Sequence, residues 1–381
     1  MDFSWSAEQL ALRDAVLAFA RRELNGDVAE RDARGTFSRE LWRKCAAHGI
    51  QGLCMPEAYG GGGADPLTAV LALEALGEGC EDAGLCFAIN AQLWSVQTPI
   101  LRFGSEEQRA RCLPKLCAGE WIAAHGMSEP DTGSDAFALT TRAERVDDDY
   151  RLTGVKTFVS DAPEADLFLV FATVAREQGV LGITGFLVER DTPGLHVGRP
   201  IAKMGLRTSP MAELTLDGCV VPAANRLGRE GRGATIFNDS MEWERGCLLS
   251  SALGAMQRQL DRSTRHARER RQFGRPIAEF QAVSHRLAEM RLRLEAARLM
   301  VYRAAWTKQR DCPAAAESSM AKLFASEALV QSSLDAVQIL GGYGFCTEYG
   351  AERELRDAVG SRAYSGTNDI QREIIARALG L

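Results

Sequence analysis

Four polar segments, far apart along the chain, contain residue types that could bind a cofactor or move a proton. Three of them are Met-Ser-Glu-Pro-Asp-Thr-Gly-Ser-Asp at 127–135, Lys-Thr-Phe-Val-Ser at 156–160 and Arg-Glu-Arg-Arg-Gln-Phe-Gly at 268–274. The fourth, 338–371, contains Gly341, Gly342 and Gly344 and then Tyr-Ser-Gly-Thr-Asn-Asp. Glycine lets the backbone lie close to a flat or anionic ligand, and a helix start offers free N–H groups. The segments indicate a cofactor edge, although each one alone is also typical of a turn, a strand or a solvated helix face.

A candidate base is Glu244 in the run Met-Glu-Trp-Glu-Arg-Gly at 241–246. A carboxylate held against an acidic C–H bond can remove its proton. The alternative is a solvated carboxylate on a helix face, paired with Arg245 or Arg258. Glu242 points to another face of the same helix, and we expect it to be structural or to contact the edge of a cofactor.

Other kinds of chemistry lack their usual markers. The sequence has no P-loop, no Gly-x-Gly-x-x-Gly after a strand, no Gly-x-Ser-x-Gly and no His-Glu-x-x-His. Its ten cysteines form no Cys-x-x-Cys pair and its five histidines are widely spaced, so we expect no metal site, no disulfide framework and free thiols in a reducing cytoplasm. A net charge of −6 argues against nucleic acid as a partner, and no signal or membrane-spanning run is visible.

The segments must be positioned by three regions with different patterns. Residues 1–120 read as an all-helical domain, with Ser6 as a cap, Leu10, Leu17, Ala20 and Leu24 on one face, and breaks at Gly35, 56–66 and Pro99. Residues 121–229 hold six of the twelve prolines and predict an antiparallel β domain with strands at 153–160, 167–174, 185–189 and 212–221 and a turn at 147–149. Residues 230–381 return to helix, where Leu287, Met290, Leu294, Ala297, Val301 and Ala304 form one buried stripe. The fold class is therefore α+β, with a sheet domain between two helical domains.

Taken together and in this order, the four segments resemble the acyl-CoA dehydrogenase family over essentially the whole chain. The resemblance implies that family's fold, with a C-terminal domain like a four-helix bundle, and FAD bound at the interface of a homo-oligomer, usually a tetramer. The FAD contacts that it implies are Met127, Ser128, Ser134, Phe158, Ser160, Arg270, Phe273, Gln338, Gly341, Gly342, Thr367 and Asp369. The substrate contacts that it implies are Ser134, Arg245, Tyr364 and Gly366.

The chain departs from the commoner family pattern at the catalytic position. Many members carry a glutamate immediately before the Gly-Thr pair, where this chain has Ser365. A serine hydroxyl cannot be the base without help, because its pKa lies far above neutrality. The branch that resembles isovaleryl-CoA and long-chain acyl-CoA dehydrogenases instead places the glutamate before the arginine that is Arg245 here. The resemblance therefore implies Glu244 as the base, with the backbone N–H of Ser365 as a donor to the developing enolate oxygen.

Several C-terminal phrases, among them 239–247 and 364–377, resemble family members of antibiotic and pigment pathways that oxidise an aminoacyl group, often prolyl, on a carrier protein. The expected activity is FAD-dependent α,β-dehydrogenation of an acyl or aminoacyl thioester on CoA or a carrier protein. The expected electron acceptor is an electron-transfer flavoprotein or oxygen. Two alternatives stand beside it, a flavin-dependent oxygenase on the same scaffold and a catalytically silent flavoprotein, and Glu244 argues against the second.

Overall fold

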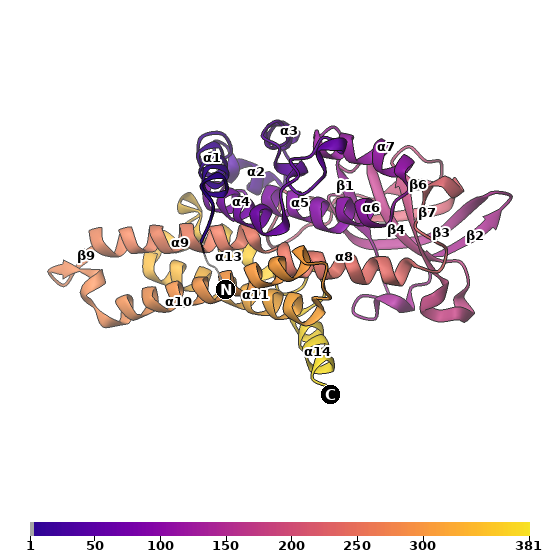
Figure 1. Ribbon diagram of the computed structural model, residues 1–381. Helices are drawn as coiled ribbons and strands as arrows, with labels where there is room; N and C mark the ends of the chain where they lie inside the picture. The colour runs from indigo at the N-terminus through magenta and orange to yellow at the C-terminus, as the bar shows by residue number, and fades with distance from the viewer. Residues whose placement is uncertain (1–3) are drawn as a thin grey trace.

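The computed structural model describes residues 4–381, which form three parts in chain order (Figure 1). Helices come first, a β-sheet domain follows, and helices make up the rest, which confirms the predicted fold class. The N-terminal helices are α1 (Ala7–Glu23), α2 (Val28–Arg34), α3 (Arg39–Ala47), α4 (Pro66–Gly79), α5 (Ala83–Gln92), α6 (Thr98–Phe103) and α7 (Glu106–Cys117). Within the described residues, no helix has the length and apolar character needed to cross a membrane.

The first helix starts where the sequence predicts. The Ser6 hydroxyl accepts a hydrogen bond from the Gln9 N–H at 3.1 Å, and the Gln9 side chain accepts one from the Ser6 N–H at 2.9 Å. This reciprocal capping box satisfies two N–H groups that a helix start leaves free. Ala20 and Leu24 on the predicted face are fully buried, whereas Leu10 and Leu17 are only partly covered.

The break predicted at Pro99 takes an unexpected form. The chain remains helical from α5 into α6, and the π-helical segment Leu93–Gln97 lies between them. Such a segment interrupts the i→i−4 ladder, which a proline cannot complete because it has no N–H. The Leu93 carbonyl accepts from both the backbone N–H of Thr98 and its hydroxyl, the latter at 2.9 Å. The π-helical turn matters below because it contains Ser95.

The middle part is an eight-stranded sheet with the order β6-β7-β3-β2-β4-β5-β8 and with β1 beside β4. Its strands are β1 (Ala123–Gly126), β2 (Arg142–Val146), β3 (Asp149–Ser160), β4 (Leu167–Thr173), β5 (Ile183–Glu189), β6 (Leu195–Val197), β7 (Met211–Val221) and β8 (Arg226–Leu227). The four predicted strands correspond to β3, β4, β5 and β7, and the predicted turn joins β2 to β3. The four strands that were missed are mostly too short to show an alternating pattern.

The sheet is mixed rather than purely antiparallel. β1 runs parallel to β4 over four residue pairs, and β2 is parallel to β4 at Arg142 and Thr173. Parallel neighbours need a long connection, and here β2 and β3 lie between β1 and β4 in the chain. The other pairings, including those of β3 with β2 and β7, are antiparallel as predicted.

The C-terminal part is built on long helices. Its helices are α8 (Gly233–Cys247), α9 (Ser250–Glu269), α10 (Gln281–Gln309), α11 (Ala315–Leu340), α12 (Gly342–Phe345), α13 (Ala351–Gly360) and α14 (Asn368–Ala378). Helices α8 to α11 pack against one another, and a small hairpin, β9 (Arg271–Gln272) and β10 (Arg275–Pro276), joins α9 to α10. Met290, Leu294, Ala297, Val301 and Ala304 are buried on α10, so the predicted stripe is core, and Leu287 packs partly buried against it.

The loop 201–210 connects the sheet domain to both helical parts. The Leu206 N–H donates to the Asp357 carboxylate of α13 at 2.5 Å, and the Thr208 hydroxyl donates to Asp82, the cap of α5. Burial raises the pKa of Asp357 to about 7. The three parts are thus joined through buried carboxylates that accept hydrogen bonds from one loop.

Asp161 makes the stability of this junction depend on pH. It accepts a hydrogen bond from the Ser209 hydroxyl at 2.7 Å, and burial raises its pKa from 3.8 to about 7. Because the folded state holds this proton more tightly than the unfolded state, stability falls as the pH rises from about 4 to about 7. We expect the free energy of unfolding of Asp161→Asn, measured relative to that of wild type, to be roughly 2 to 3 kcal/mol higher at about pH 8 than at about pH 5. Unfolding midpoints at the two pH values measure this, with exposed Asp217→Asn as the control. If the stability difference between Asp161→Asn and wild type is the same at both pH values, the prediction is wrong.

Candidate active site

Glu244 lies in the last turn of α8 and is buried, with 9% of its surface exposed. Both of its carboxylate oxygens accept hydrogen bonds from serine hydroxyls. Ser95 in the π-helical turn donates to Oε2 at 2.5 Å, and Ser365 donates to Oε1. The carboxylate is therefore held in one orientation by residues of the N-terminal part and of the loop before α14.

The loop that contains Ser365 has an unusual backbone, which its neighbours hold in place. Ser365 has φ 58° and Gly366 has φ 84°, a region that residues with a Cβ rarely occupy. The Ser365 carbonyl accepts from Arg245 Nε at 3.0 Å and from Gln371 Nε2 at 3.2 Å. The Gly366 carbonyl accepts from Lys322 Nζ and Gln371 Nε2, each at 2.9 Å. These bonds fix the Ser365 hydroxyl and N–H relative to Glu244.

The alternative interpretation of Glu244 as a solvated helix-face pair does not hold. Arg245 donates to the Ser365 carbonyl instead, and Arg258 pairs with Glu354 at 3.2 Å. Glu242, as predicted, is structural: its Oε2 accepts from Lys308 Nζ and from the Ala314 N–H, both at 3.1 Å. The two glutamates of the same helix thus have different environments.

Two residues of this site escaped the sequence analysis. Ser95 lies 149 residues before Glu244, and its only signal is a small polar residue between apolar neighbours. Lys322 lies in α11 and is 1% exposed; burial and the nearby charge of Arg245 lower its pKa to about 7. A lysine on the buried face of a long helix is a signal that could have been noticed, because burying an ammonium group is costly.

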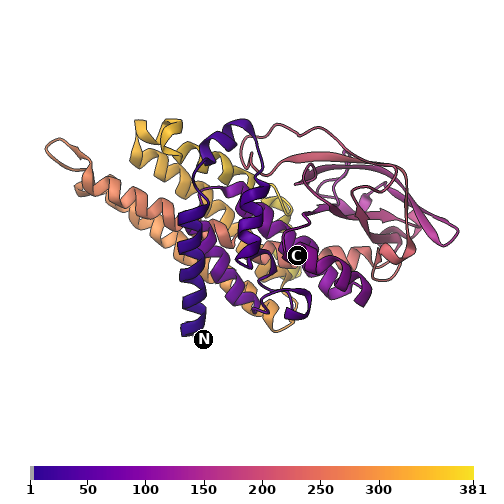
Figure 2. The same ribbon diagram turned by 90° about the horizontal axis from the view of Figure 1, so that it is seen from above.

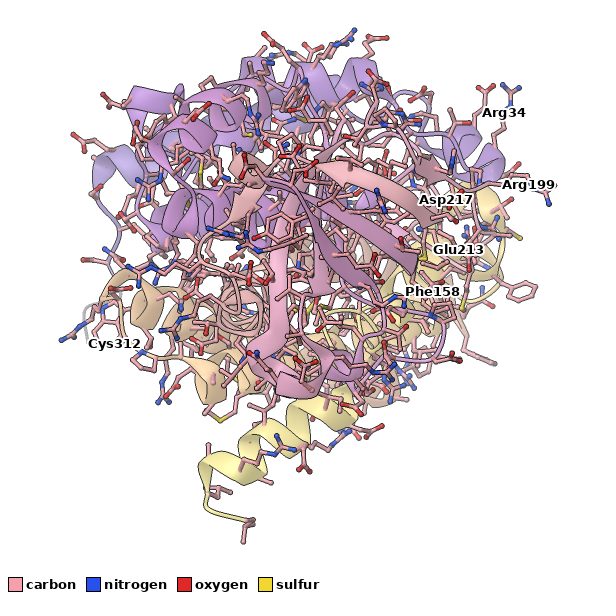
Figure 3. All side chains as sticks on the ribbon, turned by 90° about the vertical axis from the view of Figure 1, so that its right-hand side faces the viewer. Arg34, Phe158, Arg199, Glu213, Asp217 and Cys312 are labelled. Atoms are coloured by element: carbon pink, nitrogen blue, oxygen red, sulfur yellow. The ribbon has the colours of Figure 1, made fainter. Side chains whose placement is uncertain are left out.

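The first group of predicted cofactor contacts lies where β1 and β3 meet. The Met127 carbonyl accepts from Lys156 Nζ at 3.1 Å, and the Ser128 carbonyl accepts from the Thr157 N–H at 2.9 Å. Phe158 sits at an irregularity of β3, with φ 54°, and is 64% exposed. Figure 3 shows it near Glu213 of β7. Ser134 is exposed and Ser160 half-buried nearby in the chain. An exposed aromatic ring on a rigid strand suits contact with a flat ligand.

A buried ion pair holds this edge. Lys156 Nζ donates to Glu129 Oε1 at 2.8 Å, and both side chains are almost wholly inside the protein. Burial opposes the charge of Glu129, but Lys156 and the hydroxyls of Thr140 and Thr141 outweigh it and lower its pKa to about 2. For Lys156, burial outweighs the attraction of Glu129 and lowers its pKa to about 8. Both groups are therefore charged at neutral pH.

A second group of predicted contacts lies at the opposite end of the molecule. Phe273, in the β9–β10 hairpin, is 93% exposed, and Arg270 stands 5.8 Å from the centroid of the Tyr343 ring. Gln338, Gly341 and Gly342 are exposed where α11 ends and α12 begins, and a Cβ built on either glycine would meet no atom within 4 Å. Figures 1 and 2 both show this hairpin at one end and the sheet domain at the other. One chain therefore does not bring the two groups of predicted contacts to one cofactor.

The remaining predicted residues lie at the start of α14 or next to Ser365. Thr367 caps α14 through its side chain, and Asp369 is exposed and pairs with Arg372 at 2.9 Å. Tyr364 packs against Phe87 with ring centroids 4.9 Å apart. The structure thus brings Glu244, Arg245, Tyr364, Ser365 and Gly366 together.

The edge around Met127 and Phe158 fits a flavin. Thr132, in the same loop, has a buried hydroxyl with no hydrogen-bond partner in the described residues, so it is free to bond a ligand. The exposed Phe158 ring and the open backbone at Gly341 and Gly342 fit the flat and the anionic parts of FAD. The residues present therefore suit this cofactor at two separate places on the surface.

Comparison with known proteins shows the family. Three family descriptions match the chain: acyl-CoA dehydrogenase N-terminal domain at 6–120, middle domain at 124–219 and C-terminal domain at 231–380. The L-prolyl-peptidyl-carrier protein dehydrogenase of Pseudomonas fluorescens is 46% identical over 346 residues, 91% of each chain. The solved prolyl acyl carrier protein oxidase AnaB is 48% identical with a TM-score of 0.98, covering 99% of this chain and all of that one. A structure titled PigA with FAD and proline is 41% identical with a TM-score of 0.97, covering both chains fully.

The fold, the site and these likenesses define a flavin-dependent oxidoreductase that acts on thioesters. The chain belongs to the acyl-CoA dehydrogenase family. It uses FAD and dehydrogenates an acyl or aminoacyl thioester between Cα and Cβ.

Proposed function

We propose that this enzyme oxidises an aminoacyl thioester, with a prolyl group as the first candidate, on the phosphopantetheine of a carrier protein, and that Glu244 is its base. The observation that carries the proposal is a buried carboxylate with a serine hydroxyl on each oxygen. The relatives support the substrate class. Those named for prolyl carrier proteins are 42% to 48% identical to this chain, against 41% for an acyl-CoA dehydrogenase of Bacillus subtilis and 37% for the short-chain acyl-CoA dehydrogenase of Megasphaera elsdenii.

In the proposed reaction Glu244 takes the proton from Cα of the thioester. FAD, when bound, supplies the acceptor for the hydride that leaves Cβ. The carbonyl oxygen of the thioester gains negative charge as the Cα–H bond breaks, and a fixed donor at that oxygen lowers the barrier. The Ser365 N–H is the proposed donor, because Arg245, Gln371 and Lys322 hold its loop in one conformation.

The proposed substrate contacts surround this point. Arg245, Tyr364 and Gly366 are adjacent to Glu244 or Ser365, and exposed Ser134 is accessible to the pantetheine arm. A cavity of about 60 Å³ begins beside Tyr364 and Leu248, one helical turn beyond Glu244. On a scale where one water needs about 10 to 15 Å³, this volume suits a short or cyclic acyl group.

The proposed cofactor site is shared between subunits. The flavin lies by Met127, Ser128, Phe158 and Ser160 of one subunit, and the pyrophosphate and adenine lie by Arg270, Phe273, Gln338, Gly341 and Gly342 of another, with Thr367 and Asp369 nearby. The distance between these two groups within one chain supports this arrangement. A homo-oligomer, in the family usually a tetramer, is therefore part of the proposal.

Arg270→Ala tests this sharing. Its guanidinium is the cation expected at the pyrophosphate, and charge-assisted bonds to phosphate are among the stronger polar contacts. We expect lower flavin occupancy and a looser oligomer together, measured by absorbance per chain and by mass in solution. Arg265→Ala, in the same exposed basic stretch, is the control. Full flavin and an unchanged mass for Arg270→Ala argue that the stretch is only a solvated basic face.

The function itself is tested with prolyl thioesters of a carrier protein and of CoA under anaerobic conditions. We expect the flavin absorbance to bleach faster with the carrier-bound substrate and the product to lose hydrogen without gaining oxygen. A product that gains oxygen indicates the oxygenase alternative. Reoxidation by air or by an electron-transfer flavoprotein identifies the electron acceptor.

All ten cysteines are free, which supports the proposed cytoplasmic location.

A further inference from the structure

Ser95 places a buried hydroxyl directly on the carboxylate of the proposed base. It is 2% exposed, and its hydrogen is donated to Glu244 Oε2. A hydroxyl oxygen has two further lone pairs, and no donor in residues 4–381 reaches them. One helical turn beyond Glu244, the cavity wall contains the apolar side chains of Phe87, Leu248 and Leu249 and the ring of Tyr364. A buried acceptor with spare capacity beside the proposed base fits a substrate that brings a donor.

The chemistry of an aminoacyl substrate supplies that donor at the same place. Cα carries four groups, and in the proposed function three of them have assigned directions. The proton faces Glu244, the carbonyl faces the Ser365 N–H, and Cβ faces the flavin. The amine nitrogen takes the remaining direction, and it is bonded to the carbon whose proton Glu244 removes. Its N–H groups therefore lie within the reach of the groups that surround the carboxylate.

Of the two hydroxyls on Glu244, Ser95 is the better placed acceptor. Ser365 bonds Oε1 from the loop that faces the thioester carbonyl, whereas Ser95 bonds the other oxygen from the opposite, N-terminal part of the protein. The backbone of Ser95 is fixed by the π-helical turn, and its neighbour Trp94 stacks on Trp243 of α8 at 5.8 Å. Its hydroxyl is therefore held at a fixed position beside the carboxylate.

We propose that Ser95 is a specificity-determining residue that accepts a hydrogen bond from the α-amine of an aminoacyl thioester while it donates to Glu244. The inference rests on the proposed function and deepens it. A substrate with carbon in place of that nitrogen leaves the Ser95 oxygen buried and unpaired. Sites built to bond a polar group reject the analogue that lacks it.

The test compares two substrates of nearly equal shape, prolyl-pantetheine and cyclopentanecarbonyl-pantetheine, by anaerobic flavin reduction. For wild type we expect a higher kcat/KM with the prolyl thioester. Ser95→Ala is expected to lower the ratio of the two kcat/KM values by about 10- to 100-fold, the range for a hydrogen bond to a charged group. Ser95→Thr keeps the hydroxyl and should keep most of the ratio. The control Ser240→Ala removes a different buried hydroxyl, one in α8 that donates to the Phe237 carbonyl, and should leave the ratio unchanged.

If Ser95→Ala lowers kcat/KM equally for both substrates, the proposal is overturned, because this result shows that Ser95 only positions Glu244. A binding measurement separates this failure from failure of the proposed function. Pantetheine thioethers that carry a pyrrolidinylmethyl or a cyclopentylmethyl group lack the carbonyl and are not oxidised. Flavin absorbance reports their binding. Ser95→Ala should weaken the binding of the pyrrolidinylmethyl thioether and leave that of the cyclopentylmethyl thioether unchanged. If wild type oxidises neither thioester, the proposed function fails; equal binding of both thioethers by wild type and variant refutes the role of Ser95 even then.

Discussion

Replacing Glu244 with glutamine is expected to slow flavin reduction by about 10² or more, the usual scale for the loss of a positioned general base. Glutamine keeps the shape of the side chain, its carbonyl oxygen can accept from one of the two serines, and its NH2 group can donate to the hydroxyl oxygen of the other, so FAD and thioester should still bind. Rapid mixing with substrate in the absence of oxygen measures the reduction rate. Reduction at the wild-type rate would exclude Glu244 as the base and remove the assignment to the alternative-glutamate branch.

Two variants sharpen this prediction. Glu242→Gln changes a glutamate on the same helix that bonds Lys308 and Ala314, so we expect little change in reduction rate. Adding Ser365→Glu to Glu244→Gln returns a carboxylate to the commoner family position and should restore part of the activity where the acyl group leaves room. From the sequence alone, Ser365→Ala is expected to leave the rate of flavin reduction nearly unchanged. The hydrogen bond from Ser365 to the Glu244 carboxylate raises the expected loss to about 10-fold, the lower end of the range for a bond to a charged group.

Lys156→Met is expected to cause the largest loss of stability, about 3 to 5 kcal/mol, because it leaves the Glu129 carboxylate buried without its cation. The reason lies in the pair itself: Lys156 is fully buried and donates to Glu129 at 2.8 Å. It also donates to the Met127 carbonyl, so the flavin edge should loosen at the same time. Urea unfolding and flavin occupancy measure the two effects.

The paired control is Lys156→Met with Glu129→Gln. Removing both charges ends the cost of an unpaired buried ion, and replacing a buried pair by neutral groups is often close to neutral for stability. The double variant should therefore recover much of the stability that the single variant loses. A single variant that loses less than about 1 kcal/mol contradicts the prediction, since that is the range of an exposed pair.

Local patterns account for the elements that the sequence predicted correctly. The capping box at Ser6, the apolar stripe of α10 and the four longer strands each arise from neighbouring residues, whose spacing matches the period of a helix or a strand. The order of the four polar segments was likewise sufficient for the family resemblance, and through it for the choice of Glu244 over Ser365 as the base. These conclusions needed only information along the chain.

The tertiary structure decided what depends on residues far apart in the sequence. The Ser95 and Ser365 hydroxyls reach Glu244 across 149 and 121 positions, and no local period predicts such a meeting. The parallel pairing of β1 with β4 and the burial of Lys322 are of the same kind. Sequence spacing fixes which face of an element is apolar, whereas the partner of a buried polar group is set by the packing of whole elements against one another. For that reason the sequence was enough to propose Glu244 as the base, whereas only the structure identified the hydroxyls that bond its carboxylate.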